Sequence, residues 1–287
     1  MNKGRIDLHT HSFYSDGKDS PLELAKLALK RGVFTLAITD HANLSAEKEL
    51  TSFPGLTLIN GTELDVNAGT HKIHIIGYDY NASNNDLKSI VNEQIEQRKL
   101  LFLRRTEYLT KMRGVKFNAN DVEALLNKNI TLAAPHVEAL LTKSGYAKDN
   151  LEARQLFLRP LLVNKIEFGI KQLSLNECFE VILNAGGIPV LAHPCFIRAS
   201  TKQLRQLLYE WQALGLMGIE VYHSDHTTEQ TQTYLKLANE IDLLISGGSD
   251  YHGSIVKPSI ELGTGINNNL DIRRLSIVDY INERNKS

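Results

Sequence analysis

Short apolar segments alternate with segments of helical periodicity along most of this chain. Seven apolar runs have the length of strands, and several are nearly continuous in Val, Ile and Leu, as is typical of parallel strands covered on both faces. The expected strands are Arg5–His9, Phe34–Thr39, Thr57–Gly61, Lys72–Tyr78, Ile188–His193, Gly218–Tyr222 and Leu243–Gly247. Alternating strands and helices favour an α/β fold with a parallel sheet or barrel, and seven strands indicate an incomplete (β/α) barrel.

Helix-boundary signals support this alternation. Ser20-Pro21-Leu22-Glu23 combines a capping box with a proline at the first helical position, and Ser174 with Glu177 repeats the capping box. A third helix is predicted over residues 204–214 from its apolar spacing, and it ends at Gly215.

The alternation stops between about residue 86 and residue 171. This stretch is poor in strands, and helices are expected over Asp86–Met112, Asn120–Asn127 and Pro135–Lys143. Roughly 85 residues are too many for a plain loop, so we expect an inserted helical cap over the barrel mouth. The predicted domains are a metal-binding barrel of residues 1–85 and 172–287 and a cap, or substrate domain, of residues 86–171.

Composition and charge narrow the classes of function. The 287 residues include 32 basic and 33 acidic ones, so no basic surface is broad enough to bind long nucleic acid. The chain shows neither the apolar segment of a signal peptide nor an apolar run of about 18 residues that could cross a membrane. Its two cysteines, Cys178 and Cys195, form neither a disulfide framework nor a CxxC zinc site. We therefore expect a cytoplasmic enzyme without a membrane partner, and the sequence does not indicate the oligomeric state.

Side chains that can bind metal ions gather at the ends of the predicted strands. His9 and His11 lie two residues apart, as do Asp250 and His252, and side chains with this spacing share one face of a strand. Functional groups of (β/α) barrels gather at the C-terminal ends of the strands. The candidate ligands are His9, His11, Asp16, His41, Glu63, His74, His193, Asp250 and His252. These are too many for one ion, so we expect two to three divalent ions (Zn, Mn or Fe, with Mg also suitable) bridged by a carboxylate.

This ligand set predicts hydrolysis of a phosphoester. Neighbouring ions polarise a phosphoryl group and lower the pKa of bound water, which makes hydroxide available near neutral pH. The residues expected to be catalytic, through this metal-activated hydroxide, are His9, His11, Asp16, His193, Asp250 and His252. The chain lacks the G-x-S-x-G, P-loop and dinucleotide-binding motifs.

Several polar residues leave alternatives open. Asp40 could bind an ion or orient the neighbouring His41. Glu220 and His223 could bind an ion, support the ligands or touch substrate, and we take His223 as a candidate substrate contact. His226 lies in a polar segment and is predicted to have no function.

The ordered motifs of this chain resemble those of the PHP (polymerase and histidinol phosphatase) family. The matching segments are Asp7–Ser12, Ser15–Gly17, Ile38–His41, Gly61–Glu63, His74–Gly77, Leu191–Pro194 and Gly248–His252. The resemblance implies a distorted seven-stranded (β/α) barrel with a trinuclear metal site. It assigns His9, His11, Glu63 and Asp250 to one ion, Glu63, His74 and His193 to a second, and Asp16, His41 and His252 to a third.

The helical insertion and the segment Ala134-Pro135-His136-Val137 resemble the family branch that contains 3′,5′-nucleoside bisphosphate phosphatases. Enzymes of that branch remove the 3′-phosphate of pAp-like molecules, and some trim short RNA from its 5′ end. The branch implies substrate contacts from Arg98, Arg104, Arg105 and His136. The chain departs from the branch at Leu101, where a second arginine is usual, and at Cys195–Arg198, where Gly-Arg-Tyr is common.

The leading prediction is therefore a metal-dependent phosphatase that acts on a small nucleotide or a short oligonucleotide. Histidinol-phosphate phosphatase is the nearest alternative, because it shares the metal site. A non-catalytic metal-binding or regulatory PHP module is the alternative from another class, and C–N bond hydrolysis of the amidohydrolase type is a third. The helical insertion and the full ligand set favour the first prediction.

Overall fold

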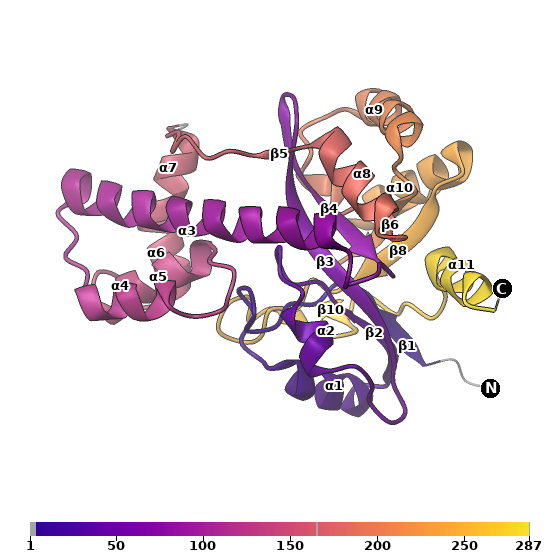
Figure 1. The fold of residues 1–287 in the computed structure, drawn as a ribbon, viewed down its shortest axis with the longest axis horizontal. Helices are drawn as coiled ribbons and strands as arrows, with labels where there is room; N and C mark the ends of the chain where they lie inside the picture. Colours follow the sequence, from indigo (N-terminus) through magenta and orange to yellow (C-terminus); the bar gives the residue numbers. More distant parts are fainter. Residues whose placement is uncertain (1–3, 165, 287) are drawn as a thin grey trace.

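The computed structural model describes residues 4–164 and 166–286, and strands curl into a barrel at its centre (Figure 1). The chain ends of the predicted barrel domain, residues 1–3 and 287, and Lys165 of the predicted cap lie outside this description. Around the barrel the strands follow the order β1-β2-β3-β4-β6-β7-β8. They are β1 (Arg5–Asp7), β2 (Val33–Ile38), β3 (Thr57–Ala68), β4 (His71–Tyr78), β6 (Ile188–Leu191), β7 (Gly218–His223) and β8 (Leu244–Gly248). The α/β class and the seven predicted strands are confirmed.

The two ends of this strand order meet, which closes the barrel. The backbone N of Leu8 donates to the O of Gly247 at 3.1 Å, and the N of Asp250 donates to the O of His9 at 2.8 Å. Neighbouring strands run parallel except at β4, which is antiparallel to both β3 and β6. This single reversed strand distorts the (β/α) pattern.

The predicted end of the third strand at Gly61 is wrong. β3 continues to Ala68 and turns at Gly69, which has a φ of +74°, into the antiparallel strand β4. Apolar Leu64 and Val66 alternate with polar residues along this extension and are buried, which is the pattern of a strand with one face in the core. Glu63 therefore lies inside a strand and not at its end.

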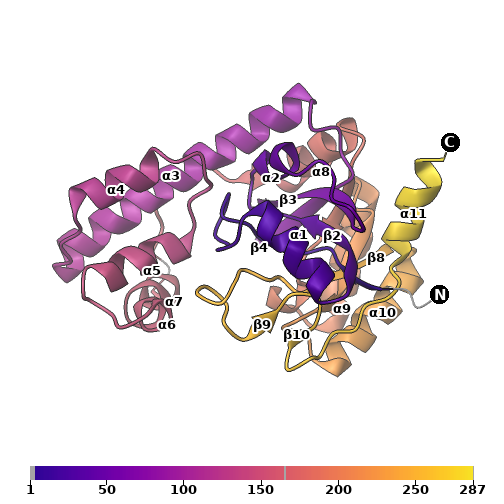
Figure 2. The same ribbon diagram turned by 90° about the horizontal axis from the view of Figure 1, so that it is seen from below.

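Helices cover the outside of the barrel, as Figures 1 and 2 show. The capping boxes predicted at Ser20 with Glu23 and at Ser174 with Glu177 are both present. These helices are α1 (Pro21–Lys30), α2 (Ser45–Glu49), α8 (Leu175–Asn184), α9 (Thr201–Leu214), α10 (Thr228–Ile241) and α11 (Ser276–Arg284). The short strands are β5 (Leu173–Ser174), which pairs with β3, and the hairpin of β9 (Ile260–Glu261) and β10 (Gly265–Ile266).

A helical cap lies beside the barrel, and the long helix α3 extends from the side of the barrel into the cap (Figure 2). The cap contains α3 (Asn85–Arg113), α4 (Ala119–Leu126), α5 (Ala134–Lys143), α6 (Asn150–Ala153), the π-helical turn η1 (Arg154–Leu158) and α7 (Arg159–Val163). Leu87 and Val91 of α3 pack in the barrel core, whereas Phe102 and Leu109 pack in a separate cap core. We propose that the predicted cap, residues 86–171, is one unit built on this shared helix. None of the described helices is long and apolar enough to span a membrane.

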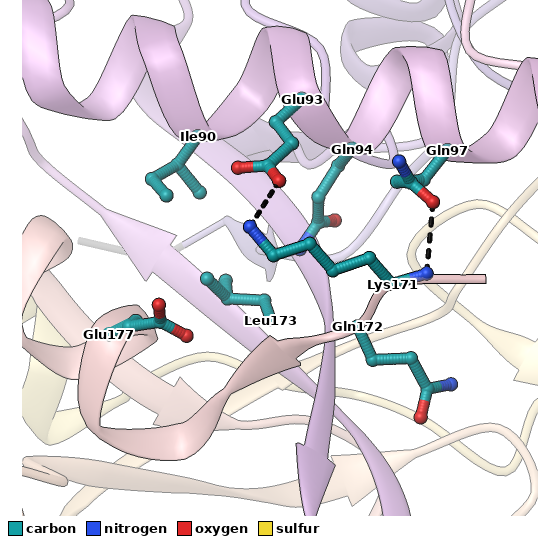
Figure 3. Close-up of a pocket in the computed structure, with 8 residues that line it drawn as sticks. All are labelled: Ile90, Glu93, Gln94, Gln97, Lys171, Gln172, Leu173 and Glu177. Atoms are coloured by element: carbon teal, nitrogen blue, oxygen red, sulfur yellow. Dashed lines mark hydrogen bonds and ion pairs between the residues drawn. The ribbon is translucent and has the colours of Figure 1, made fainter.

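The chain returns from the cap to the barrel along α3 (Figure 3). The backbone N of Lys171 donates to Oε1 of Gln97 at 2.9 Å, and its ammonium pairs with Glu93 at 2.5 Å. The cavity beneath Lys171 has a volume of about 20 Å³, room for little more than one water molecule. No predicted ligand or substrate contact lines it, so it is not the candidate site.

Gly248, at the seam between β1 and β8, is expected to be sensitive to substitution. A Cβ at Gly248 would lie 2.3 Å from the backbone N of His9 and 2.5 Å from its Cβ. Gly248→Ala should therefore lower the free energy of unfolding by about 1–3 kcal/mol, the usual cost of overpacking. Thermal unfolding would measure this, with Ser254→Ala in the exposed loop after His252 as the control. An unchanged Tm for Gly248→Ala would contradict the closed seam.

Candidate metal centre

The predicted ligands converge on the carboxylate of Glu63, which is 1% exposed. Its Oε1 lies 2.7 Å from Nδ1 of His74 and 2.8 Å from Nε2 of His193. Its Oε2 lies 3.5 Å from Nε2 of His9 and 3.3 Å from Nε2 of His11. One carboxylate thus lies between two groups of imidazoles.

Asp16 is the centre of a neighbouring group. Its Oδ1 lies 3.3 Å from Nε2 of His252, 3.8 Å from Nδ1 of His11 and 3.9 Å from Nε2 of His41. These four residues are buried and can offer one ligand atom each, all within 4.8 Å of one another. That spacing suits a single ion.

Asp250, which follows β8 at the seam with β1, also belongs to the cluster. Its Oδ1 lies 3.5 Å from Nε2 of His9 and 3.3 Å from Nε2 of His11, while its Oδ2 lies 3.4 Å from Nε2 of His223. Lys257 forms an ion pair with Oδ2 of Asp250, a contact that the sequence did not indicate. The structure therefore brings all nine predicted ligands together at one end of the barrel, and their binding of ions stays a prediction.

Hydrogen bonds fix which ring nitrogen of several histidines faces the cluster. Nδ1 of His9 lies 3.0 Å from Oε1 of Glu220, and Nδ1 of His252 lies 2.8 Å from the backbone O of Asp250. Because these acceptors hold a proton on Nδ1, the lone pair of each neutral ring lies on Nε2, as in metal-binding histidines. Nε2 of His9 and Nε2 of His11 are buried without a hydrogen-bond partner among the described residues. Metal ions would satisfy these atoms, so the donor set fits the ions that the sequence predicts.

The electrostatics of the cluster favour bound cations. Burial opposes protonation of His9, but Glu220, Asp250 and Glu63 outweigh it and raise the pKa of His9 well above its usual value. Burial likewise opposes the charge on His74, yet Glu63 and Asp65 raise its pKa to about 10. A field that holds protons on imidazoles also attracts metal ions, which would displace those protons.

Two carboxylates whose roles the sequence left open form hydrogen bonds with segments that carry candidate ligands. Glu220 is fully buried, bonds Nδ1 of His9 and accepts from the backbone N of His193 at 2.7 Å. Asp40 accepts from Ser12 and Ser15 and not from His41, its neighbour in sequence. Both side chains shape the loops that carry candidate ligands.

Two candidate ligands occupy strained backbone positions. His193 has a φ of +27° and Asp250 a φ of +57°, values that side-chain-bearing residues rarely adopt. Their backbone N–H groups are held by Glu220 and by the O of His9. Such strain persists only where surrounding contacts enforce it, and it concentrates at functional sites.

The cap helix α3 is tied to the centre through Asp65. Arg98 pairs with the Asp65 carboxylate at 2.7 Å, and Gln94 bonds both backbone groups of Asp65. Asp65 in turn lies 3.0 Å from Nε2 of His74. Sequence analysis missed Asp65, although its position two residues after Glu63 on one strand face was a usable signal.

A cap loop also docks on the barrel loops that carry Asp16 and His41. The backbone N of Thr131 donates to the O of Tyr14 at 2.8 Å, and its hydroxyl donates to the O of Ala42 at 3.1 Å. These bonds place the start of α5 beside the centre.

The predicted substrate contacts fall in different places. His136 lies in the first turn of α5, and its Nδ1 accepts from the backbone N of Ala133 at 3.0 Å, so its neutral ring carries the proton on Nε2. Arg105 is half-buried, and burial together with the charge of Arg98 lowers its pKa to about 10. Arg104 instead donates to the O of Phe168 and to the O of Gly169.

A further cap arginine, Arg154, was not predicted. It pairs with both oxygens of the buried Glu138 at 2.7 and 3.1 Å, and its side chain is 42% exposed. The Glu138 hydrogen bond raises the pKa of Arg154, and the Asp16 carboxylate adds to this effect. No motif in the sequence marked it, because its position depends on how the cap folds back over the barrel.

Comparisons with known proteins agree with this geometry. The sequence profile of the PHP domain matches residues 7–151. A 5′-3′ exoribonuclease from Haemophilus influenzae is 31% identical over 86% of this chain and 90% of its own length. A phosphoribosyl 1,2-cyclic phosphate 1,2-diphosphodiesterase from Eggerthella lenta is 31% identical over 86% and 94%. A 3′,5′-nucleoside bisphosphate phosphatase from Chromobacterium violaceum is 28% identical over 86% and 87%.

The fold is also shared with a solved structure. A candidate metal-dependent phosphoesterase from Bifidobacterium adolescentis superimposes with a TM-score of 0.76 at 28% identity, over 92% of both chains. The shared property of these proteins is phosphoester chemistry, while their named substrates differ.

The fit of the centre to metal ions leads to a direct test. Chelator-treated protein should gain about 5–10 °C in Tm when Mn²⁺ or Zn²⁺ is added at about 100 times its dissociation constant, because ligand binding at that level adds about 2.7 kcal/mol. His11→Ala should lose most of this shift. His71→Ala is the matched control, since His71 begins β4 and its side chain points to the strand face opposite His74. An equal shift in His11→Ala and wild type would contradict the proposed ligand set.

Proposed function

This chain belongs to the PHP domain family and is a metal-dependent phosphoesterase, and from that premise we propose that it removes the 3′-phosphate of small 3′,5′-nucleoside bisphosphates. The proposal includes trimming of short oligoribonucleotides from the 5′ end. The observation that carries it is the docking of Thr131 on the loops of Tyr14 and Ala42. This contact sets polar and cationic cap side chains beside the phosphoesterase centre. The relatives named as a bisphosphate phosphatase and an exoribonuclease support the same substrate class.

We propose that the nine clustered residues hold two to three divalent ions of Zn, Mn or Fe, with Mg as a further candidate. Bound ions supply charge for the phosphate oxygens and activate water for attack on phosphorus. Glu220 orients His9 through Nδ1 and holds the backbone of His193, so both imidazoles keep their positions. A His or Asp residue of the site gives a proton to the leaving ribose oxygen.

The cap residues bind the second phosphate in this proposal. His136 donates from Nε2, because the N–H of Ala133 occupies its Nδ1. Arg105 adds positive charge, and Arg154 presents the exposed edge of its guanidinium while Glu138 holds the other edge. Charge-assisted hydrogen bonds of this kind give bisphosphates an advantage over monophosphates.

Arg98 and Arg104 have structural roles in this proposal and do not bind substrate. Arg98 positions Asp65, which supports His74, whereas Arg104 anchors the cap through the carbonyl groups of Phe168 and Gly169. The resemblance to the bisphosphate-phosphatase branch had implied that both arginines contact substrate.

Steady-state kinetics with adenosine 3′,5′-bisphosphate and adenosine 3′-monophosphate test the proposal. Wild type should have the higher kcat/KM for the bisphosphate, and Arg105→Ala should reduce that value by about 10-fold or more, since a hydrogen bond to a charged group contributes about 1.5–3 kcal/mol. Hydrolysis of the monophosphate should change less. Arg159→Ala removes an exposed cap arginine and serves as the control. Equal efficiency of wild type on both nucleotides would exclude the second-phosphate contact, and a preference for histidinol phosphate would support the alternative enzyme.

A further inference from the structure

Cys195, His223 and His226 form a second group of metal-type side chains at the flank of the centre. Cys195 lies in the short 3-10 turn η2 (Pro194–Phe196) after β6, and the two histidines lie at and just after the end of β7. One ligand atom from each residue lies within 4.8 Å of the others. Cys195 and His226 are outside the nine clustered residues, whereas Nε2 of His223 lies 3.4 Å from Oδ2 of Asp250, so this group borders the phosphoesterase centre.

His226 has the hydrogen bonding of a metal ligand. The sequence predicted an ordinary loop residue, but the side chain is buried, and His226 is only 6% exposed. Nδ1 of its ring lies 2.9 Å from the backbone O of Val221, which holds the ring proton there. The lone pair on Nε2 is left buried without a hydrogen-bond partner among the described residues. An unsatisfied buried acceptor is costly and indicates a missing partner.

His223 can complete the group with support from Asp225. Its Nε2 is buried without a hydrogen-bond partner among the residues that the structure describes, and its ring centroid lies 5.2 Å from that of His226. Nδ1 accepts from the backbone N of Asp225 at 3.1 Å and lies 4.0 Å from the Asp225 carboxylate. An ion at Nε2 would move the ring proton to Nδ1, which would break the bond from the N–H of Asp225 and require the carboxylate to move closer as the acceptor.

Cys195 supplies a softer ligand. It is partly buried, and its sulfur lies within 4.8 Å of a ring nitrogen of His223 and of His226. Sulfur together with imidazole nitrogen selects Zn²⁺, Co²⁺ or Cd²⁺ over Mg²⁺ and Mn²⁺.

We propose that Cys195, His223 and His226 form an auxiliary site for a thiophilic divalent cation such as Zn²⁺. On binding, the Cys195 S–H bond breaks, the proton passes to solvent, and the sulfur and two imidazole nitrogens coordinate the ion. In this proposal His223 binds an ion, whereas the sequence analysis took it as a candidate substrate contact.

Co²⁺ added to the chelator-treated full chain tests this proposal. The nine clustered residues offer only nitrogen and oxygen, so a thiolate-to-Co²⁺ charge-transfer band in the near ultraviolet reports a cysteine ligand. Wild type should show this band, Cys195→Ser should lose it, and His226→Gln should weaken it. Cys178→Ala should keep it, because Cys178 is fully buried in the apolar core. Far-ultraviolet circular dichroism would verify that each variant is folded.

Alkylation gives a second readout that does not depend on enzymatic activity. Cd²⁺ should protect Cys195 of wild type from iodoacetamide and should protect it less in His226→Gln. The proposal is wrong if wild type binds Co²⁺ with visible d–d bands but no charge-transfer band, or if the band persists in Cys195→Ser. Either result leaves the phosphoesterase proposal untouched, since that centre contains no sulfur.

Discussion

The arrangement of the candidate ligands at one end of the barrel depends on the Glu63 carboxylate, which is buried among five imidazoles. The side chain is 1% exposed, and its oxygens lie 2.7–3.5 Å from nitrogens of His9, His11, His41, His74 and His193. A buried carboxylate is tolerated only where positive charge and hydrogen bonds replace its hydration. Protons on His9, His11 and His74, whose pKa values are raised, or bound metal ions would supply that charge.

Other buried carboxylates, outside the nine candidate ligands, hold the backbone that carries those ligands. Asp7 accepts from the backbone N of Ser249 at 2.8 Å and of Gly263 at 2.7 Å, which holds the seam of the barrel beside Asp250. Glu220 does the same for His193. The bond from Glu220 supports the positive φ of His193, and the bond from the N–H of Asp250 to the O of His9 supports that of Asp250, because a strained backbone persists where surrounding contacts fix it. The positions of the candidate ligands thus depend in part on carboxylates outside the set of nine.

The sequence predicted the strands and the convergence of ligands well, because both follow from local patterns. Apolar runs locate strands, and parallel strands deliver their C-terminal ends to one edge. The sequence did not predict the contacts that depend on pairing between residues far apart in the chain. The extension of β3 to Ala68 and the reversal of β4 place Asp65 opposite His74, and only that register brings Arg98 to a carboxylate. Arg154 was missed for the same reason, since its partner Glu138 lies on another cap helix.

The two attachments of the cap link the proposed substrate contacts to the candidate metal centre. Gln94 and Arg98 of α3 hold the strand that carries Glu63, and Thr131 holds the loops that carry Asp16 and His41. The metal-type ligands can act only on the phosphate, which every phosphoester shares. We propose that discrimination comes from cap groups that reach the rest of the molecule, such as Arg105 and His136. A change of cap side chains can therefore change the substrate while the attachments keep the ligands in place.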